Sequence, residues 1–118
     1  MLTLRQEQYD SLRQTALDAF VAKMVHHLGE RFPEECERLG EASLRSLIRG
    51  GIERGAEHGI SDENDVCRWL EYLVRFGPDF GCDSQSWARP FLLDNGMDGT
   101  RKMNALDDYY LFVLTLEK

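Results

Sequence analysis

The sequence predicts an all-α fold, with five to six helices packed in an orthogonal or bundle-like arrangement. Three observations lead to this prediction. Apolar residues recur at three- and four-residue steps through most of the chain, which is the period of an amphipathic helix. No convincing alternation of apolar and polar residues, the pattern of a half-buried strand, accompanies them. The 118 residues also suffice for one hydrophobic core. We therefore expect residues 1–118 to form a single helical domain.

A long first helix is expected to begin near the N-terminus and to end near Gly29 or shortly after it. Thr3 and Gln6 have the spacing of a capping box, in which the threonine hydroxyl accepts a hydrogen bond from a free amide at the helix start. Such a helix is about 40 Å long at 1.5 Å per residue, so the other helices are expected to pack on it. Its predicted apolar face contains Tyr9, Leu12, Ala16, Leu17, Phe20, Met24, Val25 and Leu28.

Two more helices are predicted before residue 60. Pro33 suits the first turn of a short helix over 34–39, because the amide that proline lacks has no helical partner there, and Gly40 suits its end. A third helix is expected over about 41–58, followed by Gly59 in the conformation that commonly ends a helix. Its apolar residues are Leu44, Leu47, Ile48 and Ile52.

Gly51, Gly55 and Gly59 recur at four-residue spacing, which places them on one face of the third helix. A glycine inside a helix costs about 1 kcal/mol relative to alanine, so close approach of another helix is expected as compensation. We therefore interpret the three glycines as helix-packing residues. Two alternatives stay open for the approaching helix: the chain's own first or fourth helix, or a helix of a partner.

The fourth helix has the clearest amphipathic pattern of the chain, with Ser61 as its expected N-cap. Its apolar residues are Val66, Trp69, Leu70, Leu73 and Val74. Residues 77–86 are expected to form a loop because of their glycine, proline, aspartate and serine content. A short helix over 87–93 is expected to follow, capped by Ser84 or Ser86 and with Pro90 in its first turn.

The loop and its flanks, RFGPDFGCDSQSW over 75–87, concentrate aromatic residues. Aromatic side chains on a stiff loop lose little entropy on binding and often dominate interfaces. A domain this small, however, also needs its aromatic residues in the core. Both alternatives, docking and core closure, are open at this point. For docking, the predicted partner-binding residues are Phe76, Gly77, Pro78, Asp79, Phe80 and Trp87.

A last helix is expected after Asp98 or Thr100, either of which could cap it, and it contains Met103, Leu106, Tyr110, Val113 and Leu114. Residues 109–114 are apolar or aromatic without a break, although a half-buried helix needs apolar groups on one side only. Either this helix is central to the core, or one of its faces binds another chain. In the second case, the expected partner-binding residues are Tyr109, Tyr110 and Phe112.

The net charge and the cysteines indicate which classes of partner and which cellular compartment to expect. A net charge of −7 argues against a binder of nucleic acid and against adhesion to an anionic membrane surface. No apolar segment typical of a signal peptide or a membrane span is visible. Cys36, Cys67 and Cys82 are odd in number and widely spaced, as expected for free thiols in a reducing compartment. We therefore expect a cytoplasmic protein that binds another protein, and a homo-oligomer stays open as an alternative.

The sequence predicts no catalytic residue, no metal and no cofactor. Residues 79–81 match the Asp-Phe-Gly triplet of protein kinases, but the other kinase motifs are missing. His26 and His27 are adjacent, about 100° apart around a helix, and the cysteines form no close pair of the kind that structural zinc sites use. Residues 94–105 lack the final glutamate of a calcium-binding loop. The catalytic alternative is a site formed only by the fold, in a cleft that holds His58, Cys67 or Cys82 near acidic groups.

Three segments carry a resemblance to a known family: RGGIER over 49–54, DVC over 65–67 and FGPDF over 76–80. The N-terminal segments LRQEQYDSL, FVAKMVHHL and RFPEECERLG are similar as well, whereas residues 81–118 depart from the pattern. The family that the chain resembles consists of small proteins encoded in the effector clusters of bacterial type VI secretion systems, beside spike and PAAR genes.

The resemblance implies a co-chaperone, which helps an adaptor chaperone hold a toxic effector until the effector is loaded on the spike. The alternative from the same gene clusters is an immunity protein that blocks the active site of a toxin. An acidic surface would suit that role if the toxin were a basic nuclease.

Overall fold

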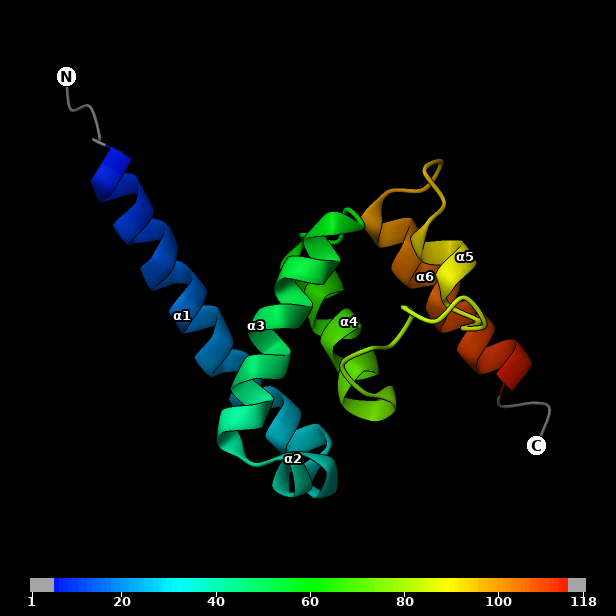
Figure 1. Ribbon diagram of the computed structural model, residues 1–118, viewed down its shortest axis with the longest axis horizontal. Helices are drawn as coiled ribbons and strands as arrows, with labels where there is room; N and C mark the ends of the chain where they lie inside the picture. Colours follow the sequence, from blue (N-terminus) through cyan, green and yellow to red (C-terminus); the bar gives the residue numbers. More distant parts are fainter. Residues whose placement is uncertain (1–5, 115–118) are drawn as a thin grey trace.

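Helices make up most of the chain in the computed structural model, which describes residues 6–114, with side chains from residue 11 onward (Figure 1). They are α1 (Gln6–Arg31), α2 (Pro33–Leu39), α3 (Glu41–Glu57), α4 (Glu63–Phe76), α5 (Arg89–Leu92) and α6 (Gly99–Tyr109), and α6 continues into a π-helical turn, η1 (Tyr110–Leu114). These residues contain no strand, so the predicted all-α fold is confirmed. The capping box predicted at Thr3 lies outside the described residues.

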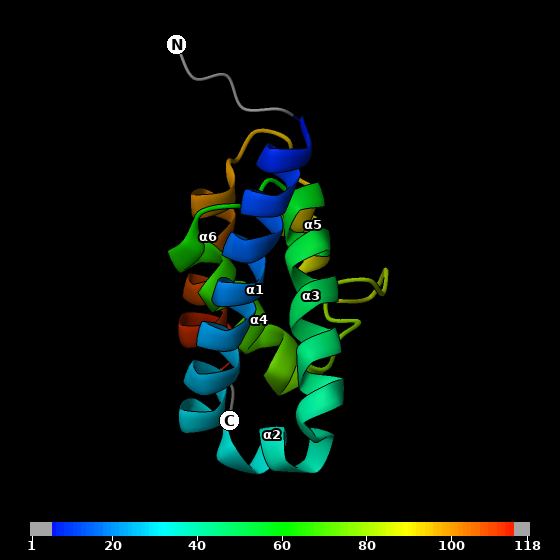
Figure 2. The same cartoon turned by 90° about the vertical axis from the view of Figure 1, so that its left-hand side faces the viewer.

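α1 and α3 lie side by side, with α2 across their shared end (Figure 2). Pro33 stands in the first turn of α2, and Gly40 ends it with a φ of 83°, as predicted. α3 is about two thirds as long as α1 at 1.5 Å per residue, so the N-terminal part of α1 extends away from the other helices (Figure 1). The predicted apolar residues Leu12 and Ala16 are exposed for this reason, whereas Val21, which the prediction omitted, is buried.

α4, rather than the longer α1, is the central helix. It contacts α1, α2, α3 and α6, and all five of its predicted apolar residues are buried. Its N-cap is Asp62, whose carboxylate accepts a hydrogen bond of 3.0 Å from the Asn64 amide. The prediction of Ser61 as the cap is therefore wrong by one residue. An aspartate and a serine in neighbouring positions are both good caps, so sequence preference alone could not choose between them.

The glycines of α3 face α4. A Cβ on Gly51 would lie 2.5 Å from Leu73 Cδ1, and a Cβ on Gly55 would lie 3.1 Å from Trp69 Cδ1. Trp69 also donates a hydrogen bond of 2.9 Å from its indole nitrogen to the Gly51 carbonyl. The approaching helix is thus the chain's own fourth helix. Gly59 does not share this face, because α3 ends at Glu57 and Gly59 follows it with a φ of 80°.

The C-terminal part closes over the other side of α4. α5 is shorter than predicted and has Pro90 in its first turn, and Asp98, one of the two predicted caps, accepts a hydrogen bond of 2.8 Å from the Arg101 amide at the start of α6. Lys102 is buried, and its ammonium donates hydrogen bonds of 2.8 Å to the carbonyls of His58 and Leu92. One cation therefore joins α6 to α5 and to the turn between α3 and α4.

Candidate functional site

The loop after α4 folds back over that helix and gathers seven aromatic side chains, which we call the aromatic cluster. Its members are Tyr72, Phe76, Phe80, Trp87, Phe91, Tyr109 and Tyr110. Phe80 stacks on Tyr72 with 5.4 Å between ring centroids, and Trp87 stacks on Tyr109 at 5.1 Å. Such pairs contribute about 0.5–1.5 kcal/mol each beyond the area they bury. The loop and α6 are therefore held to α4 through the same rings.

The predicted partner-binding residues divide into buried and exposed ones. Phe80 is only 7% exposed and packs 5.9 Å from the buried Trp69, so it closes the core. Phe76 and Phe112 are 47% and 66% exposed. Among the others, Gly77, Trp87, Tyr109 and Tyr110 are half-buried, and Pro78 and Asp79 are exposed. The exposed residues stay predicted docking residues, whereas Phe80 has a core position.

Arg54 anchors this loop to α3. Its guanidinium donates hydrogen bonds to the carbonyls of Pro78 and Phe80 and lies 5.1 Å over the Trp69 ring. A guanidinium suits this position because its planar fork can serve two acceptors and stack on an aromatic face at once. Arg54 and the loop belong to two of the three segments that carry the family resemblance. The hydrogen bonds of Arg54 thus bring these two sequence segments into contact.

Contacts of Gly81 and Cys82 also restrict the path of the loop. Gly81 has a φ of 82°, and a Cβ at this position would lie 2.5 Å from Leu92 Cδ1. Arg89 donates a hydrogen bond of 2.7 Å to the Cys82 carbonyl. These contacts hold residues 78–82 in place, and Phe76 and Pro78 lie at the edge of this held segment.

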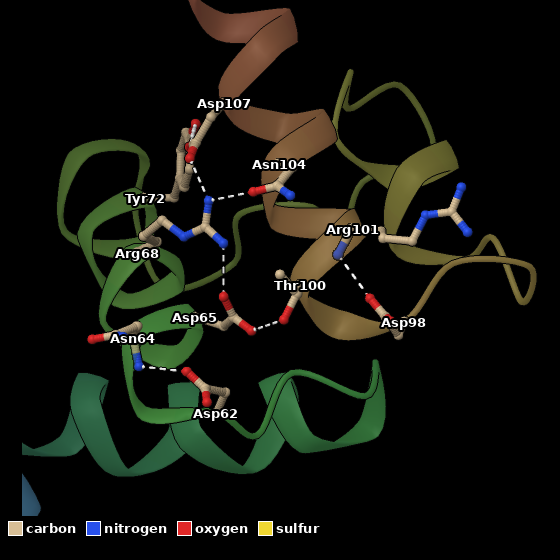
Figure 3. Close-up of polar contacts among 10 residues, drawn as sticks. All are labelled: Asp62, Asn64, Asp65, Arg68, Tyr72, Asp98, Thr100, Arg101, Asn104 and Asp107. Carbon is tan, nitrogen blue, oxygen red and sulfur yellow. Dashed lines mark hydrogen bonds and ion pairs between the residues drawn. The ribbon is translucent and has the colours of Figure 1, made fainter.

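A polar network joins α4 to α6 beside the aromatic cluster (Figure 3). Arg68 donates hydrogen bonds to Asp65 at 2.7 Å, to Asp107 at 2.8 Å and to Asn104 at 2.9 Å. The hydroxyl of Tyr72 donates to the other oxygen of Asp107 at 2.7 Å. This network fixes the angle at which α6 crosses α4 and therefore the position of η1.

The network also sets the charge state of a buried acid. Asp65 is 4% exposed, and burial alone would raise the pKa of its carboxyl, but hydrogen bonds from Thr100 and Arg68 outweigh burial and hold that pKa below its usual value. Burial, reinforced by Asp107, raises the pKa of the Tyr72 phenol, which therefore stays a hydrogen-bond donor. Sequence reasoning included Asp65 only as part of a segment that carries the resemblance and missed the network, although an aspartate and an arginine three positions apart in an apolar helix stripe were a usable signal.

Two hollows lie on either side of Arg75, which lines both. One, of about 260 Å³, lies between α4 and α6 and is lined by Arg68, Glu71, Tyr72, Arg75, Asp107, Tyr110 and Leu111. The other, of about 270 Å³, includes Leu39, Leu47, Phe76, Gly77 and Pro78 in its lining. Phe76 lines the second hollow, whose lining contains both apolar and charged groups.

Of the three residues named for the catalytic alternative, only Cys67 belongs to a group of ligand-type side chains within the described chain. His58 packs edge-on against Trp69 at 6.3 Å, and burial and the nearby Lys102 lower the pKa of its imidazole. Burial and Glu71 raise the pKa of the Cys67 thiol, which disfavours the reactive thiolate. Cys82 is exposed. Cys67 instead lies beside His27 and Glu71, a grouping that the spacing of histidines and cysteines did not predict.

Comparison with protein-family models, with curated proteins and with solved structures finds no match for this chain. The resemblance to type VI secretion accessory proteins therefore stays a prediction. Within residues 6–114, none of the helices combines the length and the apolar composition that a membrane span needs.

Proposed function

We propose that the chain is a non-catalytic protein-interaction protein that binds its partner through the exposed edge of the aromatic cluster. The observation that carries the proposal is the exposure of Phe76 and Phe112, at 47% and 66%, on a support that is otherwise packed and hydrogen-bonded. The ring of Phe76 lies 6.1 Å from that of Tyr110, where η1 begins, so this surface continues toward Phe112. Pro78 and Asp79 complete it from the loop.

The physical basis is the low entropy cost of binding through groups that are already ordered. Aromatic anchors near the centre of an interface carry a large share of binding energy in many complexes. Phe76 is held by stacking on Phe80 at 5.2 Å, so little side-chain freedom is lost when a partner covers it. The hollow lined by Tyr110 and the hollow lined by Phe76 offer space for apolar side chains of the partner.

The specific role that we propose is that of a co-chaperone, which assists an adaptor chaperone in loading a type VI secretion effector in the cytoplasm. This role rests on the family resemblance of residues 1–80. Its mechanism would be burial: the exposed aromatic edge covers an apolar surface of the adaptor or effector, and the net charge of −7 keeps the complex soluble. Three free cysteines fit a reducing compartment.

The net charge also favours a second candidate, an immunity protein that neutralises a basic toxin. The two roles differ in their partner and in its activity. A co-chaperone associates with an adaptor and leaves the effector's activity intact. An immunity protein binds its toxin one to one and abolishes the toxin's activity in the test tube.

The experiment is co-purification of the tagged chain from its native host, with identification of the partner by mass spectrometry. A Phe76→Ala, Phe112→Ala double variant is compared with Leu12→Ala, which alters a 59% exposed leucine on α1, away from the aromatic cluster. We expect wild type and Leu12→Ala to recover an adaptor or effector, and the double variant to lose it while keeping its helical circular dichroism. A monomeric chain without a partner, or equal recovery by all three proteins, would contradict the proposal.

A further inference from the structure

Three side chains that can bind a metal ion meet where α1 crosses α4. They are His27 from α1 and Cys67 and Glu71 from α4, and their donor atoms all lie within 4.8 Å of one another. Cys67 and Glu71 are four residues apart, one helical turn, so both side chains project from the same face of α4. His27 is 44 positions from Glu71 in the sequence, which is why inspection of close pairs did not find the group.

The backbone at all three positions is fixed by neighbouring core residues. Met24 and Leu28 flank His27 on α1 and are buried, and Val66 and Leu70 do the same on α4. The three side chains remain accessible from one side, since the His27 side chain is 34% exposed and that of Glu71 is 21% exposed. The group is thus held by packed helices and open to an ion from solvent, as a preorganised site requires.

We propose that His27, Cys67 and Glu71 bind a divalent transition-metal ion of the zinc type. An imidazole nitrogen, a thiolate sulfur and a carboxylate oxygen together suit a borderline-soft ion such as Zn²⁺, whereas Mg²⁺ and Ca²⁺ select oxygen ligands. Zinc lies about 2.0–2.3 Å from such ligands, which places the ligands roughly 3.3–3.8 Å apart in a tetrahedron. Donor atoms within 4.8 Å need only small side-chain rotations to reach that spacing. Three protein ligands leave the fourth position for water.

Two existing contacts would change on binding. Binding releases protons: the Cys67 thiol gives up its proton to become the thiolate ligand, and the proton that His27 Nε2 shares with Glu71 leaves to solvent or to Nδ1. The His27 ring nitrogen and the Glu71 carboxylate, now 2.8 Å apart, would separate slightly as the ion takes the place between them. Arg31, whose guanidinium nitrogen lies 3.5 Å from Glu71, would turn toward solvent, where its side chain is already 57% exposed. Since its positive charge opposes the ion, Arg31→Gln is expected to tighten metal binding. A bound ion would link α1 directly to α4.

Titration of the reduced, chelator-treated full chain with Co²⁺ tests the proposal, because cobalt replaces zinc and reports its ligands by absorption. Wild type is expected to show a thiolate-to-cobalt charge-transfer band that added Zn²⁺ removes. Cys67→Ser should abolish this band. Loss of an outer-shell partner alone weakens metal affinity by about 10–100-fold, so His27→Gln and Glu71→Gln should weaken cobalt binding at least tenfold. The controls are His26→Gln, on the exposed side of α1, and Cys36→Ser, another half-buried thiol; both should bind like wild type.

The proposal is overturned if wild type shows no such band at saturating cobalt, if the band survives in Cys67→Ser, or if Cys36→Ser abolishes it equally. Should Cys67→Ser fail to fold, X-ray absorption of the zinc-loaded wild type decides. One sulfur with nitrogen and oxygen ligands around the zinc supports the site, and a shell of nitrogen and oxygen alone refutes it.

Discussion

Replacing Phe80 by alanine distinguishes a core residue from a docking residue. The ring is 7% exposed and lies 5.2–5.9 Å from the rings of Phe76, Tyr72, Trp87 and Trp69. Truncating a buried phenylalanine in this way destabilises a protein by about 3–5 kcal/mol, through lost burial and the cavity left behind. At roughly 3–5 °C per kcal/mol for a domain of this size, we expect the melting temperature to fall by about 10–25 °C.

The assay is thermal and urea unfolding followed by far-ultraviolet circular dichroism, with Phe112→Ala as the matched control. Phe112 is 66% exposed, so its removal should change the free energy of unfolding by no more than about 0.5 kcal/mol. A Phe80→Ala variant within about 1 kcal/mol of wild type would refute the core assignment, because truncation of a fully packed ring cannot be that mild.

Three further predictions follow from contacts of single residues. Arg54→Met should destabilise the chain by about 1.5–3 kcal/mol, because two loop carbonyls lose a charged donor. The control Arg49→Met removes only an exposed ion pair and should cost less than about 1 kcal/mol. Urea unfolding measures both free energies. Gly99→Ala should destabilise by more than about 2 kcal/mol, since its Cβ would lie 2.2 Å from a backbone carbonyl, whereas Gly50→Ala in open space should stabilise by up to about 1 kcal/mol; melting temperatures compare the two variants. The pKa of Asp65 is lowered in the folded chain. The ionised carboxylate therefore stabilises the fold above the ordinary aspartate pKa, about 3.9, and this stabilisation is lost as the pH falls through the folded pKa. Urea midpoints of Asp65→Asn should therefore depend less on pH in the acid range than those of wild type.

Much of the helical architecture could be predicted from the sequence because its signals are local. The apolar stripe of α4, the proline that begins α2 and the glycine that ends it act within a few residues, and the structure has them where the pattern placed them. The central role of α4 was missed, because helix length is visible in a sequence and the number of packing neighbours is not. The one-residue error at Ser61 arose since Asp62 is an equally good cap.

The candidate sites depend on contacts between distant segments, so they were less predictable. The aromatic composition of the loop indicated its importance, but only its path over α4 decides that Phe80 is buried and Phe76 is exposed. Nothing in the sequence around Arg54 indicates that its guanidinium will donate hydrogen bonds to loop carbonyls 24 and 26 positions away. His27 and Cys67 come together because α1 and α4 cross, and no spacing rule contains that crossing.

The measurement that tests the proposed docking surface most directly is isothermal titration of the co-purified partner with three forms of the chain. These are wild type, the Phe76→Ala, Phe112→Ala double variant and Leu12→Ala. We predict that the double variant binds at least about thirtyfold more weakly, the equivalent of a hot-spot loss of about 2 kcal/mol, and that Leu12→Ala binds like wild type. Equal affinities for wild type and the double variant would contradict the assignment of this surface.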